Sequence, residues 1–286
     1  MDLQVVEQVA QLTEWVGEGG VVVLSGAGLS TDSGIPDYRG PSGSARRSTP
    51  MTFQAFTRDP VARRRYWARS HLGWRTIGEA RPNDGHRAVA ELQRRGVIGG
   101  IVTQNVDGLH QAAGAAEVVE LHGNLARITC LDCGDLTPRE QLAARLDAAN
   151  PRFTAAAVAI NADGDAELDD TDLDGFTVVD CEGCGGMLKP DVVYFGETVP
   201  PARVARSFEL VCGARTLLVL GSSLTVMSGR RFVLRAVKEG IRVAIVNRGV
   251  TRGEPYAGLT VDAPLGIVLP NIVDALATVS PVNAGV

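Results

Sequence analysis

Four cysteines in two Cys-x-x-Cys pairs are the residues whose spacing points most directly to binding chemistry. The first pair, Cys130 and Cys133, lies in CLDCG, and the second, Cys181 and Cys184, lies in CEGCGG. A glycine after each pair favours a tight turn that points two thiolates at one ion, and two such turns complete a tetrahedral zinc site. A redox-active pair is the alternative, but a thioredoxin-like pair needs no second pair. Because four thiolates leave no open coordination position, we expect the zinc to be structural.

A glycine turn follows an apolar run in VVVLSGAGLSTDSGIPDYRG, residues 21 to 40. In the Gly26-x-Gly28 turn, backbone N–H groups could approach a pyrophosphate closely. A hydride-transferring dehydrogenase would have a third glycine where Thr31 stands and an acidic residue at the end of a second strand, but residues 44 to 52 hold neither strand nor acid. The stretch therefore predicts dinucleotide binding and argues against hydride transfer.

Five short, apolar, β-branched runs must position these residues. Continuous apolar runs are typical of parallel strands that are covered on both faces. Two segments between them, 83 to 95 and 229 to 239, have the start and stop signals of helices. The sequence therefore predicts an α/β fold with a Rossmann-like, doubly wound parallel sheet. The five runs are 21 to 28, 99 to 107, 117 to 123, 216 to 224 and 242 to 249.

Small, amide, hydroxyl and imidazole side chains stand at the end of each run. In doubly wound sheets, ligands bind outside the carboxyl ends of the strands, so we expect these residues to gather at one edge. They are Gly26-Ala27-Gly28, Gln104-Asn105-Val106-Asp107, His122-Gly123, Gly221-Ser222-Ser223 and Asn247-Arg248.

Two stretches interrupt the alternation of strands and helices, and we interpret them as insertions that form a smaller zinc-binding and helical domain. The acidic segment NADGDAELDDTDLDG lacks the spaced glycine and terminal Glu of an EF-hand, and we expect an exposed loop there. The predicted boundaries are residues 41–80 (helical) and 127–185 (four-cysteine zinc insertion) for the small domain, and 1–40, 81–126 and 186–286 for the NAD-binding domain.

Composition limits the class of protein. The chain has 286 residues, of which 45% are hydrophobic and 21% charged, so it can bury a sizeable core. A net charge of -5 argues against direct nucleic-acid binding, which needs a basic face. With no signal-peptide pattern and no apolar run of about 18 residues, we expect a soluble, cytoplasmic protein and no membrane contact. The fifth cysteine, Cys212, is expected to be a small buried hydrophobe.

The motifs GAGLS, GIPDYRG, TQNVD, LHG, the two cysteine pairs, KPDVVYFGE, GSSL and VNRG follow one another from residue 26 to residue 249. In this order they resemble the sirtuins, NAD-dependent protein lysine deacylases, over essentially the whole chain. The variants PDYRG, QNVDGLH, KPDVVYFGETV and GSSLTVMSG are similar to the class II branch that contains the mitochondrial lipoamidase and ADP-ribosyltransferase type. The resemblance implies NAD as co-substrate, structural zinc, and acyl-lysine proteins or peptides as partners.

The resemblance also implies roles for individual residues. His122 would be the general base, and Asn105 would act with it in catalysis. An extended acyl-lysine peptide would pair with Val193, Tyr194, Phe195, Gly196 and Glu197. The residues that would contact the cofactor are Gly26, Ala27, Gly28, Ser30, Asp37, Tyr38, Arg39, Gln104, Asn105, Asp107, Gly221, Ser222, Ser223, Asn247, Arg248 and Leu265.

The implied chemistry explains these residue types. Positive charge develops at the ribose when the nicotinamide bond breaks and the acyl oxygen attacks, so the pocket needs a fixed amide network rather than a strong nucleophile. An imidazole that titrates near neutral pH can then take a proton from a ribose hydroxyl, and such a base is worth about 10² to 10⁴ in rate. The alternative for His122 is a core histidine with a satisfied hydrogen bond.

The acyl group is expected to be neutral, from acetyl to a longer chain. Desuccinylating sirtuins carry a Tyr-x-x-Arg pair upstream of a Pro-Asn, and Ser70 and Gly73 stand at those places here. Arg69 or Arg75 could substitute for the missing arginine. Two other functions stay open: a protein ADP-ribosyltransferase, and a non-catalytic NAD or ADP-ribose sensor whose zinc module binds a partner.

Overall fold

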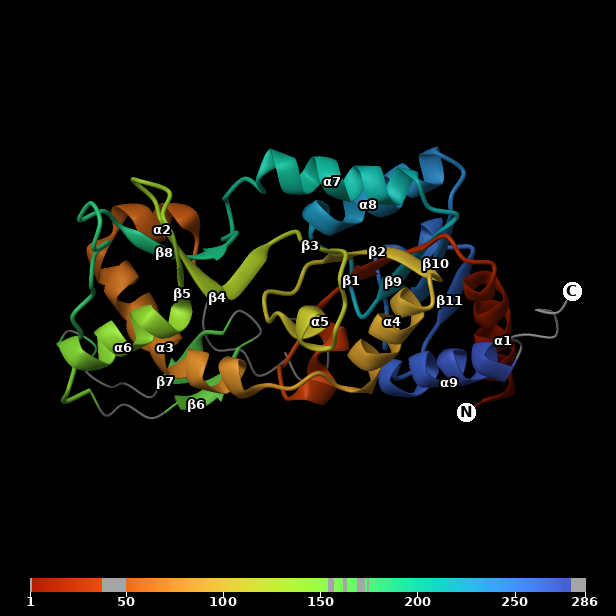
Figure 1. Ribbon diagram of the computed structural model, residues 1–286, viewed down its shortest axis with the longest axis horizontal. Coiled ribbons are helices and arrows are strands. Elements are labelled where there is room, and N and C mark those ends of the chain that lie inside the picture. The colour runs from red at the N-terminus through yellow and green to blue at the C-terminus, as the bar shows by residue number, and fades with distance from the viewer. Residues whose placement is uncertain are drawn as a thin grey trace, which may run out of the picture.

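Two groups of elements lie side by side along the long axis of the molecule (Figure 1). A large sheet with its helices occupies the end that carries α1 and α9, and small sheets with further helices occupy the other end. The computed structural model describes residues 2–37, 50–153, 157–161, 164–168, 173 and 175–278.

The large sheet has six parallel strands in the order β11-β10-β9-β1-β2-β3. The five strands predicted from apolar runs are all present, which confirms the Rossmann-like α/β fold, whereas β11 is too short for the pattern to predict. The chain winds outward from β1 in one direction to β3, and from β9 in the other direction to β11. The strands are β1 (Val21–Ser25), β2 (Ile98–Thr103), β3 (Val118–Glu120), β9 (Thr216–Leu220), β10 (Arg242–Val246) and β11 (Leu259–Val261).

Helices cover both faces of this sheet, as its continuous apolar strands require. On one face Leu12, Val89 and Leu269 belong to a core cluster with the strands, and on the other face Val211 and Phe232 do so. The first face is covered by α1 (Leu3–Gly17), α4 (Asp84–Arg94) and α9 (Leu265–Thr278), and the second by α7 (Pro201–Cys212) and α8 (Met227–Lys238).

A three-stranded antiparallel sheet, in the order β5-β4-β8, forms the centre of the smaller region. Because β4 begins at Gly123 and pairs with β8, this sheet includes residues on both sides of the predicted domain boundaries, which stay a prediction. Its strands are β4 (Gly123–Cys130), β5 (Leu136–Pro138) and β8 (Leu188–Val192). Around it lie α2 (Phe53–Arg58), α3 (Pro60–Glu79), α6 (Arg139–Ala149) and the antiparallel pair β6 (Ala157–Ile160) and β7 (Ala166–Leu168).

Local sequence signals explain where the helices of this region begin. The Asp59 side chain accepts hydrogen bonds from the N–H groups of Val61 and Ala62, and Pro60 takes the first position of α3.

Four short elements complete the described chain: the 3-10 turns η1 (Ala27–Leu29), η2 (Thr31–Ser33) and η3 (Glu254–Tyr256), and the helix α5 (Leu109–Ala112).

Two expectations about this chain are wrong. The acidic segment is not simply an exposed loop, because residues 166–168 form β7 and Asp165 is 2% exposed with an ion pair to Arg69. Cys212 is exposed rather than buried. It is the last residue of α7, and the buried face of that helix ends one residue earlier, at Val211.

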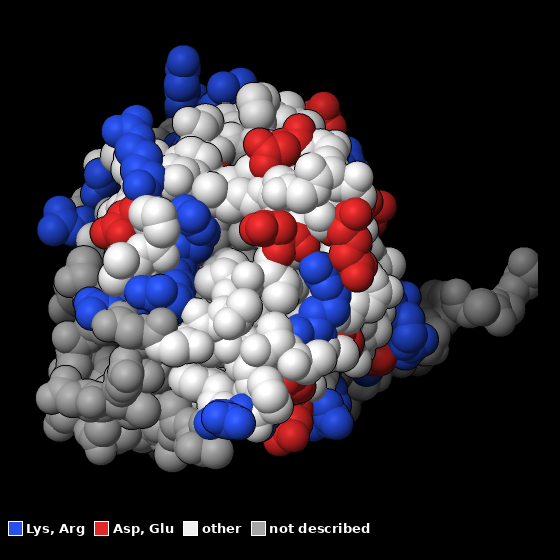
Figure 2. Space-filling view, turned by 90° about the vertical axis from the view of Figure 1, so that its left-hand side faces the viewer, with Lys and Arg blue, Asp and Glu red and all other residues white. Residues whose placement is uncertain are grey.

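Surface charge is mixed on the end of the molecule formed by the smaller region. Figure 2 shows both basic and acidic side chains on that face, separated by uncharged areas. In the smaller region, Arg75 of α3 is paired with Asp147 of α6. Among the described residues, no helix combines the length and the apolar character that crossing a membrane requires.

The close contact between α3 and the β6–β7 pair gives a stability prediction. A Cβ on Gly73 would overlap the backbone carbonyl of Gly164, so we expect Gly73→Ala to lower the free energy of unfolding by about 1–3 kcal/mol. Gly78→Ala in the same helix is the matched control: its Cβ would meet the Trp74 ring at 3.5 Å, an ordinary contact, and the variant should unfold at the native urea concentration or above it. Equal effects of the two changes in urea unfolding would contradict the close packing.

Candidate active site

A cavity of about 990 Å³ lies between the large sheet and the smaller region, outside the carboxyl ends of the parallel strands. It takes in residues that follow β1, β2, β3, β9 and β10, as the pattern of strand ends predicts. The predicted site residues that line it are Gly26, Ala27, Gly28, Ser30, Asp37, Gln104, Asn105, Asp107, His122, Val193, Tyr194, Phe195, Gly196, Glu197, Gly221, Ser222, Ser223, Asn247 and Arg248.

The glycine turn after β1 packs directly on the turn after β9. A Cβ on Gly26 would lie 2.8 Å from the Gly221 carbonyl oxygen, and a Cβ on Gly28 would lie 2.9 Å from the Gly221 Cα. The N–H groups of Gly26 and Gly28 donate to the carbonyls of Leu220 and Gly221, each at 2.9 Å. These two glycines therefore serve by letting the strand ends approach, and their own N–H groups are already used within the protein.

Side-chain amides and hydroxyls after β2 form a hydrogen-bonded network across the same edge. The Asn105 amide donates to the Gly26 carbonyl and to the Ser30 hydroxyl, both at 3.1 Å. Ser30 in turn donates to Asp107 at 2.7 Å, and the Gln104 amide donates to the Ser222 hydroxyl at 2.9 Å. Burial raises the pKa of Asp107, although the Ser30 hydrogen bond acts against the rise. The network holds polar groups in fixed positions, as catalysis by charge stabilisation requires.

His122 lies just beyond β3 with both ring nitrogens engaged. Nδ1 is 3.0 Å from the Gln104 carbonyl oxygen, which can only accept, so Nδ1 carries the hydrogen and Nε2 has the lone pair. Nε2 is 2.8 Å from the Ser228 hydroxyl. Burial lowers the pKa of His122; the Gln104 hydrogen bond opposes this, and the charges of Arg231 and Arg203 add to it. The imidazole is therefore neutral at pH 7 and can accept a proton at Nε2.

The turns after β9 and β10 present hydroxyl, amide and guanidinium groups to the cavity. Ser222, Ser223, Asn247 and Arg248 line this part of it. The Asn247 amide donates to the Arg248 and Gly249 carbonyls at 3.0 and 2.8 Å, which fixes the turn after β10. Hydroxyl and guanidinium donors of this kind suit phosphate oxygens.

Leu265 is the predicted cofactor residue that the structure places elsewhere. It is the first residue of α9 and is 6% exposed, within the core cluster on one face of the large sheet. It does not belong to the cavity lining found among the described residues. Tyr38 and Arg39 lie outside the described residues.

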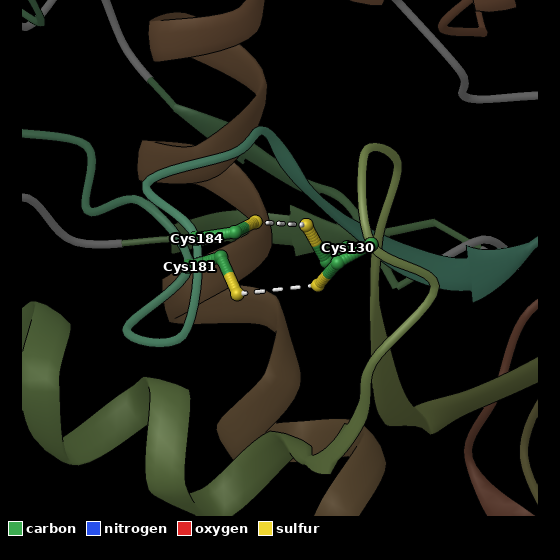
Figure 3. A group of neighbouring side chains, drawn as sticks. Cys130, Cys181 and Cys184 are labelled. Atoms are coloured by element: carbon green, nitrogen blue, oxygen red, sulfur yellow. Dashed lines mark hydrogen bonds between the residues drawn. The ribbon is translucent and has the colours of Figure 1, made fainter.

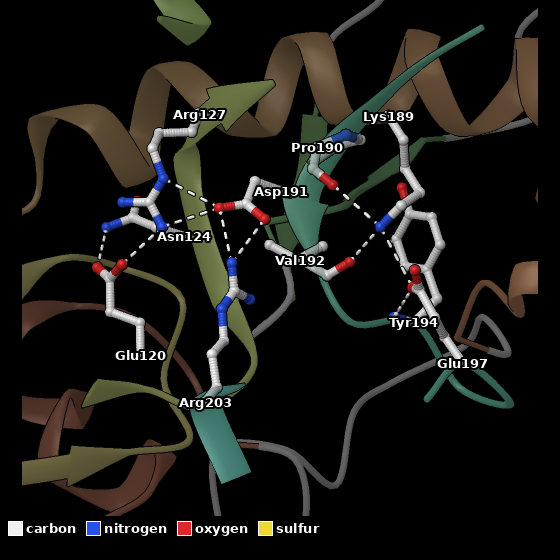
Figure 4. A network of polar contacts seen from close by, with 10 residues as sticks. All are labelled: Glu120, Asn124, Arg127, Lys189, Pro190, Asp191, Val192, Tyr194, Glu197 and Arg203. Carbon is white, nitrogen blue, oxygen red and sulfur yellow. Dashed lines mark hydrogen bonds and ion pairs between the residues drawn. The ribbon is translucent and has the colours of Figure 1, made fainter. Parts of the chain in front are cut away.

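The segment from Val193 to Glu197 follows β8 and forms part of the cavity wall. Lys189 is 3% exposed and lies 3.2 Å from the Glu197 carboxylate, which also accepts from the Tyr194 N–H at 2.8 Å (Figure 4). The Phe195 carbonyl accepts from the Phe53 N–H at 3.0 Å, which joins the segment to the start of α2. The segment is thus held from both sides.

The four predicted metal ligands come together in the smaller region. Their sulfur atoms all lie within 4.8 Å of one another, with Cys130 and Cys184 3.5 Å apart and Cys133 and Cys181 3.9 Å apart (Figure 3). Both Cys-x-x-Cys turns end at a glycine with positive φ. Four converging thiolates fit a tetrahedral zinc ion, which would join the two turns and leave no position for a substrate.

Comparison with known proteins agrees with this site. The sequence model of the Sir2 family matches residues 26–228, from the glycine turn to Ser228. The chain belongs to the Sir2 family. This confirms the resemblance to the sirtuins, although nothing distinguishes the class II branch.

Sir2-family relatives match over most of their length. An NAD-dependent protein deacetylase 1 from Streptomyces coelicolor is 62% identical over 90% of this chain and 86% of that protein. One of the same name from Mycobacterium avium is 51% identical over 90% of this chain and 91% of that protein. A solved structure of a Sir2 protein with a p53 peptide and NAD+ is 28% identical, with a TM-score of 0.75, over 94% of this chain and 98% of that one.

Several residues of the sirtuin cavity escape the sequence argument. The cavity is also lined by Tyr66 from α3 and by Ser228 and Arg231 from α8. These residues lie within helices rather than directly after a strand, so the rule of strand ends does not predict them. Periodicity alone cannot show that the first turn of α8 faces the cavity. The polar pair Ser228 and Arg231, three residues apart, is the signal that could have been followed.

Two buried histidines lie behind the amide network. His110 is 2.8 Å from the Ser25 hydroxyl through Nε2, and its ring centroid is 5.3 Å from that of His86. Burial lowers the pKa of His110 to about 3 and that of His86 to about 4; the charge of Arg87 adds to the shift of His86, and His86, once protonated in acid, adds to that of His110. Both are therefore neutral supports of the site rather than proton donors.

These depressed pKa values predict a loss of stability in acid. Below an ordinary pKa of 6.5 the unfolded chain binds a proton at each histidine that the folded chain does not bind. The free energy of unfolding should therefore fall by about 1.4 kcal/mol per pH unit for each, from pH 6.5 toward about 4. His110→Gln should be less stable at neutral pH, and its deficit should shrink as pH falls. A deficit that stays constant in urea unfolding from pH 7 to pH 4.5 would contradict burial of a neutral His110.

The cysteine cluster gives a prediction on metal content. Cys130→Ser removes one thiolate, so we expect loss of bound zinc and unfolding of the smaller region, because zinc binding can contribute roughly 10 kcal/mol to such a module. Metal analysis and thermal unfolding measure the two effects. Cys212→Ser is the matched control, since Cys212 is exposed and outside the cluster, and it should keep one zinc per chain. Native zinc content in Cys130→Ser would remove the assignment.

Proposed function

We propose that this protein removes acyl groups from protein lysine with NAD as co-substrate, yielding nicotinamide, free lysine and O-acyl-ADP-ribose. The observation that carries the proposal is the position of His122, a partly buried neutral imidazole whose Nε2 lone pair lies at the wall of a cavity that would hold a dinucleotide. The deacetylase names of the relatives and the NAD and peptide in the similar Sir2 structure support it.

Different residues of the cavity would serve different steps of the reaction. The network of Asn105, Ser30 and Asp107 would hold the ribose and nicotinamide, and the turns after β9 and β10 would hold the phosphates and adenosine. The acyl oxygen attacks the ribose carbon as nicotinamide leaves. His122 then takes a proton from a ribose hydroxyl, and that oxygen attacks the acyl carbon. An amide network that is fixed before the reaction stabilises the charge that develops.

The substrate would be an extended peptide with a neutral acyl-lysine. Val193 to Glu197 would pair with its backbone, and the acyl chain would enter the side of the cavity lined by Ile35, Met51, Tyr66 and Val106. Apolar and aromatic side chains of this kind favour an uncharged chain.

The positions that would carry an acidic-acyl pocket are closed here. Ser70 is 3% exposed and its carbonyl accepts from Arg139 at 3.0 Å, while Gly73 packs on Gly164. Arg69 is paired with Asp165 and Arg75 with Asp147, so the two arginines that could substitute are held in other ion pairs. The location in the cytoplasm and the absence of nucleic-acid binding stay predictions.

The proposal is tested by mass spectrometry of the purified protein with NAD and a panel of acetyl-, succinyl-, lipoyl- and long-acyl-lysine peptides. We expect nicotinamide, free lysine and O-acyl-ADP-ribose together, with acetyl or a longer neutral acyl group preferred to succinyl. His122→Ala should lower turnover by about 10² to 10⁴ while keeping zinc content and NAD binding.

Other outcomes point to the other functions. Nicotinamide release without deacylated peptide would favour ADP-ribosyl transfer, and NAD binding without turnover would favour a sensor. Full activity in His122→Ala would remove its role as base.

A further inference from the structure

Ser228 is a polar residue of the cavity to which the mechanism above gives no role. It is the second residue of α8, and its hydroxyl oxygen lies 2.8 Å from Nε2 of His122. Among the described residues, this hydroxyl is the hydrogen-bond partner of Nε2. The other ring nitrogen, Nδ1, faces the Gln104 carbonyl. Ser228 thus contacts the atom that must accept the proton.

The direction of this hydrogen bond follows from the other side of the ring. The Gln104 carbonyl can only accept, so Nδ1 carries the hydrogen and Nε2 is an acceptor. In the resting enzyme the Ser228 hydroxyl therefore donates to Nε2. A hydroxyl also has lone pairs, so after a rotation about its C–O bond it can accept from a protonated Nε2.

Packing fixes the first turn of α8 in this place. A Cβ on Gly229 would overlap the amide oxygen of Gln104, so the helix start lies directly on the amide network. The Gln104 amide is tied to Ser222 at 2.9 Å, and its carbonyl holds Nδ1 of His122. Ser228 and the imidazole are therefore held against each other by the same side chain and backbone.

We propose that Ser228 is a positioning residue for His122, which holds Nε2 toward the cofactor ribose and accepts its hydrogen bond once the imidazole is protonated. The inference rests on the proposed function. In the step concerned, the ribose O–H bond breaks, the proton forms an N–H bond at Nε2, and the ribose oxygen uses its lone pair to attack the acyl carbon. Before this step the Ser228 O–H rotates away from Nε2, which frees the single Nε2 lone pair for the ribose proton; Ser228 keeps its own proton and changes from donor to acceptor. The Ser228 oxygen thereby stabilises the imidazolium after the ribose oxygen has moved to the acyl carbon.

Two assays separate this role from a merely structural one. In the proposed sequence of steps nicotinamide departs before the proton reaches His122, so exchange of labelled nicotinamide into NAD in the presence of acetyl-lysine peptide would report on the first step alone. Deacylation needs both steps. A change that acts only on His122 should slow deacylation and spare the exchange.

Ser228→Ala should lower the deacylation kcat about tenfold, as expected for loss of one hydrogen bond to a charged group. Its nicotinamide exchange rate and its KM for NAD should stay within about twofold of native. Ser228→Thr keeps the hydroxyl and should recover most of the lost turnover. Met227→Ala, a change at the exposed neighbouring residue of the same helix, is the matched control and should behave as native.

Three results would overturn the inference: a native deacylation kcat in Ser228→Ala, an equal fall in exchange and deacylation, or a Ser228→Thr variant as slow as Ser228→Ala. Failure of the proposed function looks different, because the native protein itself would then release no deacylated peptide. Thermal unfolding and zinc content of each variant show that it is folded.

Discussion

Gly28 and Gly221 meet with less room between their backbones than one methyl group needs, and the arrangement of the cavity depends on this contact. It lies where the chain winds outward in two directions, between β1 and β9, which is the place where doubly wound sheets bind ligands. Because the two turns touch, the groups after β1, β2 and β9 fall within hydrogen-bond distance, as Asn105 does with the Gly26 carbonyl and Gln104 with Ser222. Larger residues would separate the strand ends and break these bonds.

A second constraint ties His122 to the cavity wall formed by residues 193–197. The chain leaves the large sheet at β3, passes through His122, and enters the small sheet as β4, so one backbone carries both His122 and the start of the smaller region. The His122 carbonyl accepts from the Val193 N–H at 2.8 Å. Beside this contact, Arg127 pairs with Glu120 of β3 at 2.6 Å and with Asp191 of β8 at 2.9 Å (Figure 4). Partly exposed ion pairs add little net stability, so we interpret this group as fixing the orientation of the two sheets.

The sequence was sufficient for the parts of the site that follow strands. Apolar runs locate the strands, and parallel packing then brings their ends together, so Gln104 and His122 could be placed at one edge without coordinates. Ser228 could not, because the side of α8 that faces the cavity depends on how the helix packs on Gln104. Cys212 and Asp165 show the same limit. The apolar character of Cys212 favours burial, but its place at the end of a helix leaves it exposed. The charge of Asp165 favours exposure, but its ion pair with Arg69 allows it to be buried.

In the proposed function, the smaller region shapes the acyl side of the cavity because α3 carries small residues at two positions, Ser70 and Gly73. Gly73 lets the backbone of Gly164 approach α3, and Ser70 leaves room for Arg139, which is 1% exposed and lies 5.0 Å from the Trp67 ring. Large polar side chains at these two places would have to displace both neighbours. Because Arg139 is held by a carbonyl and an aromatic ring, its charge is directed into the core of the smaller region rather than offered to a ligand. In the proposed function, acyl selection would therefore depend on what packs behind the cavity wall as much as on the wall itself.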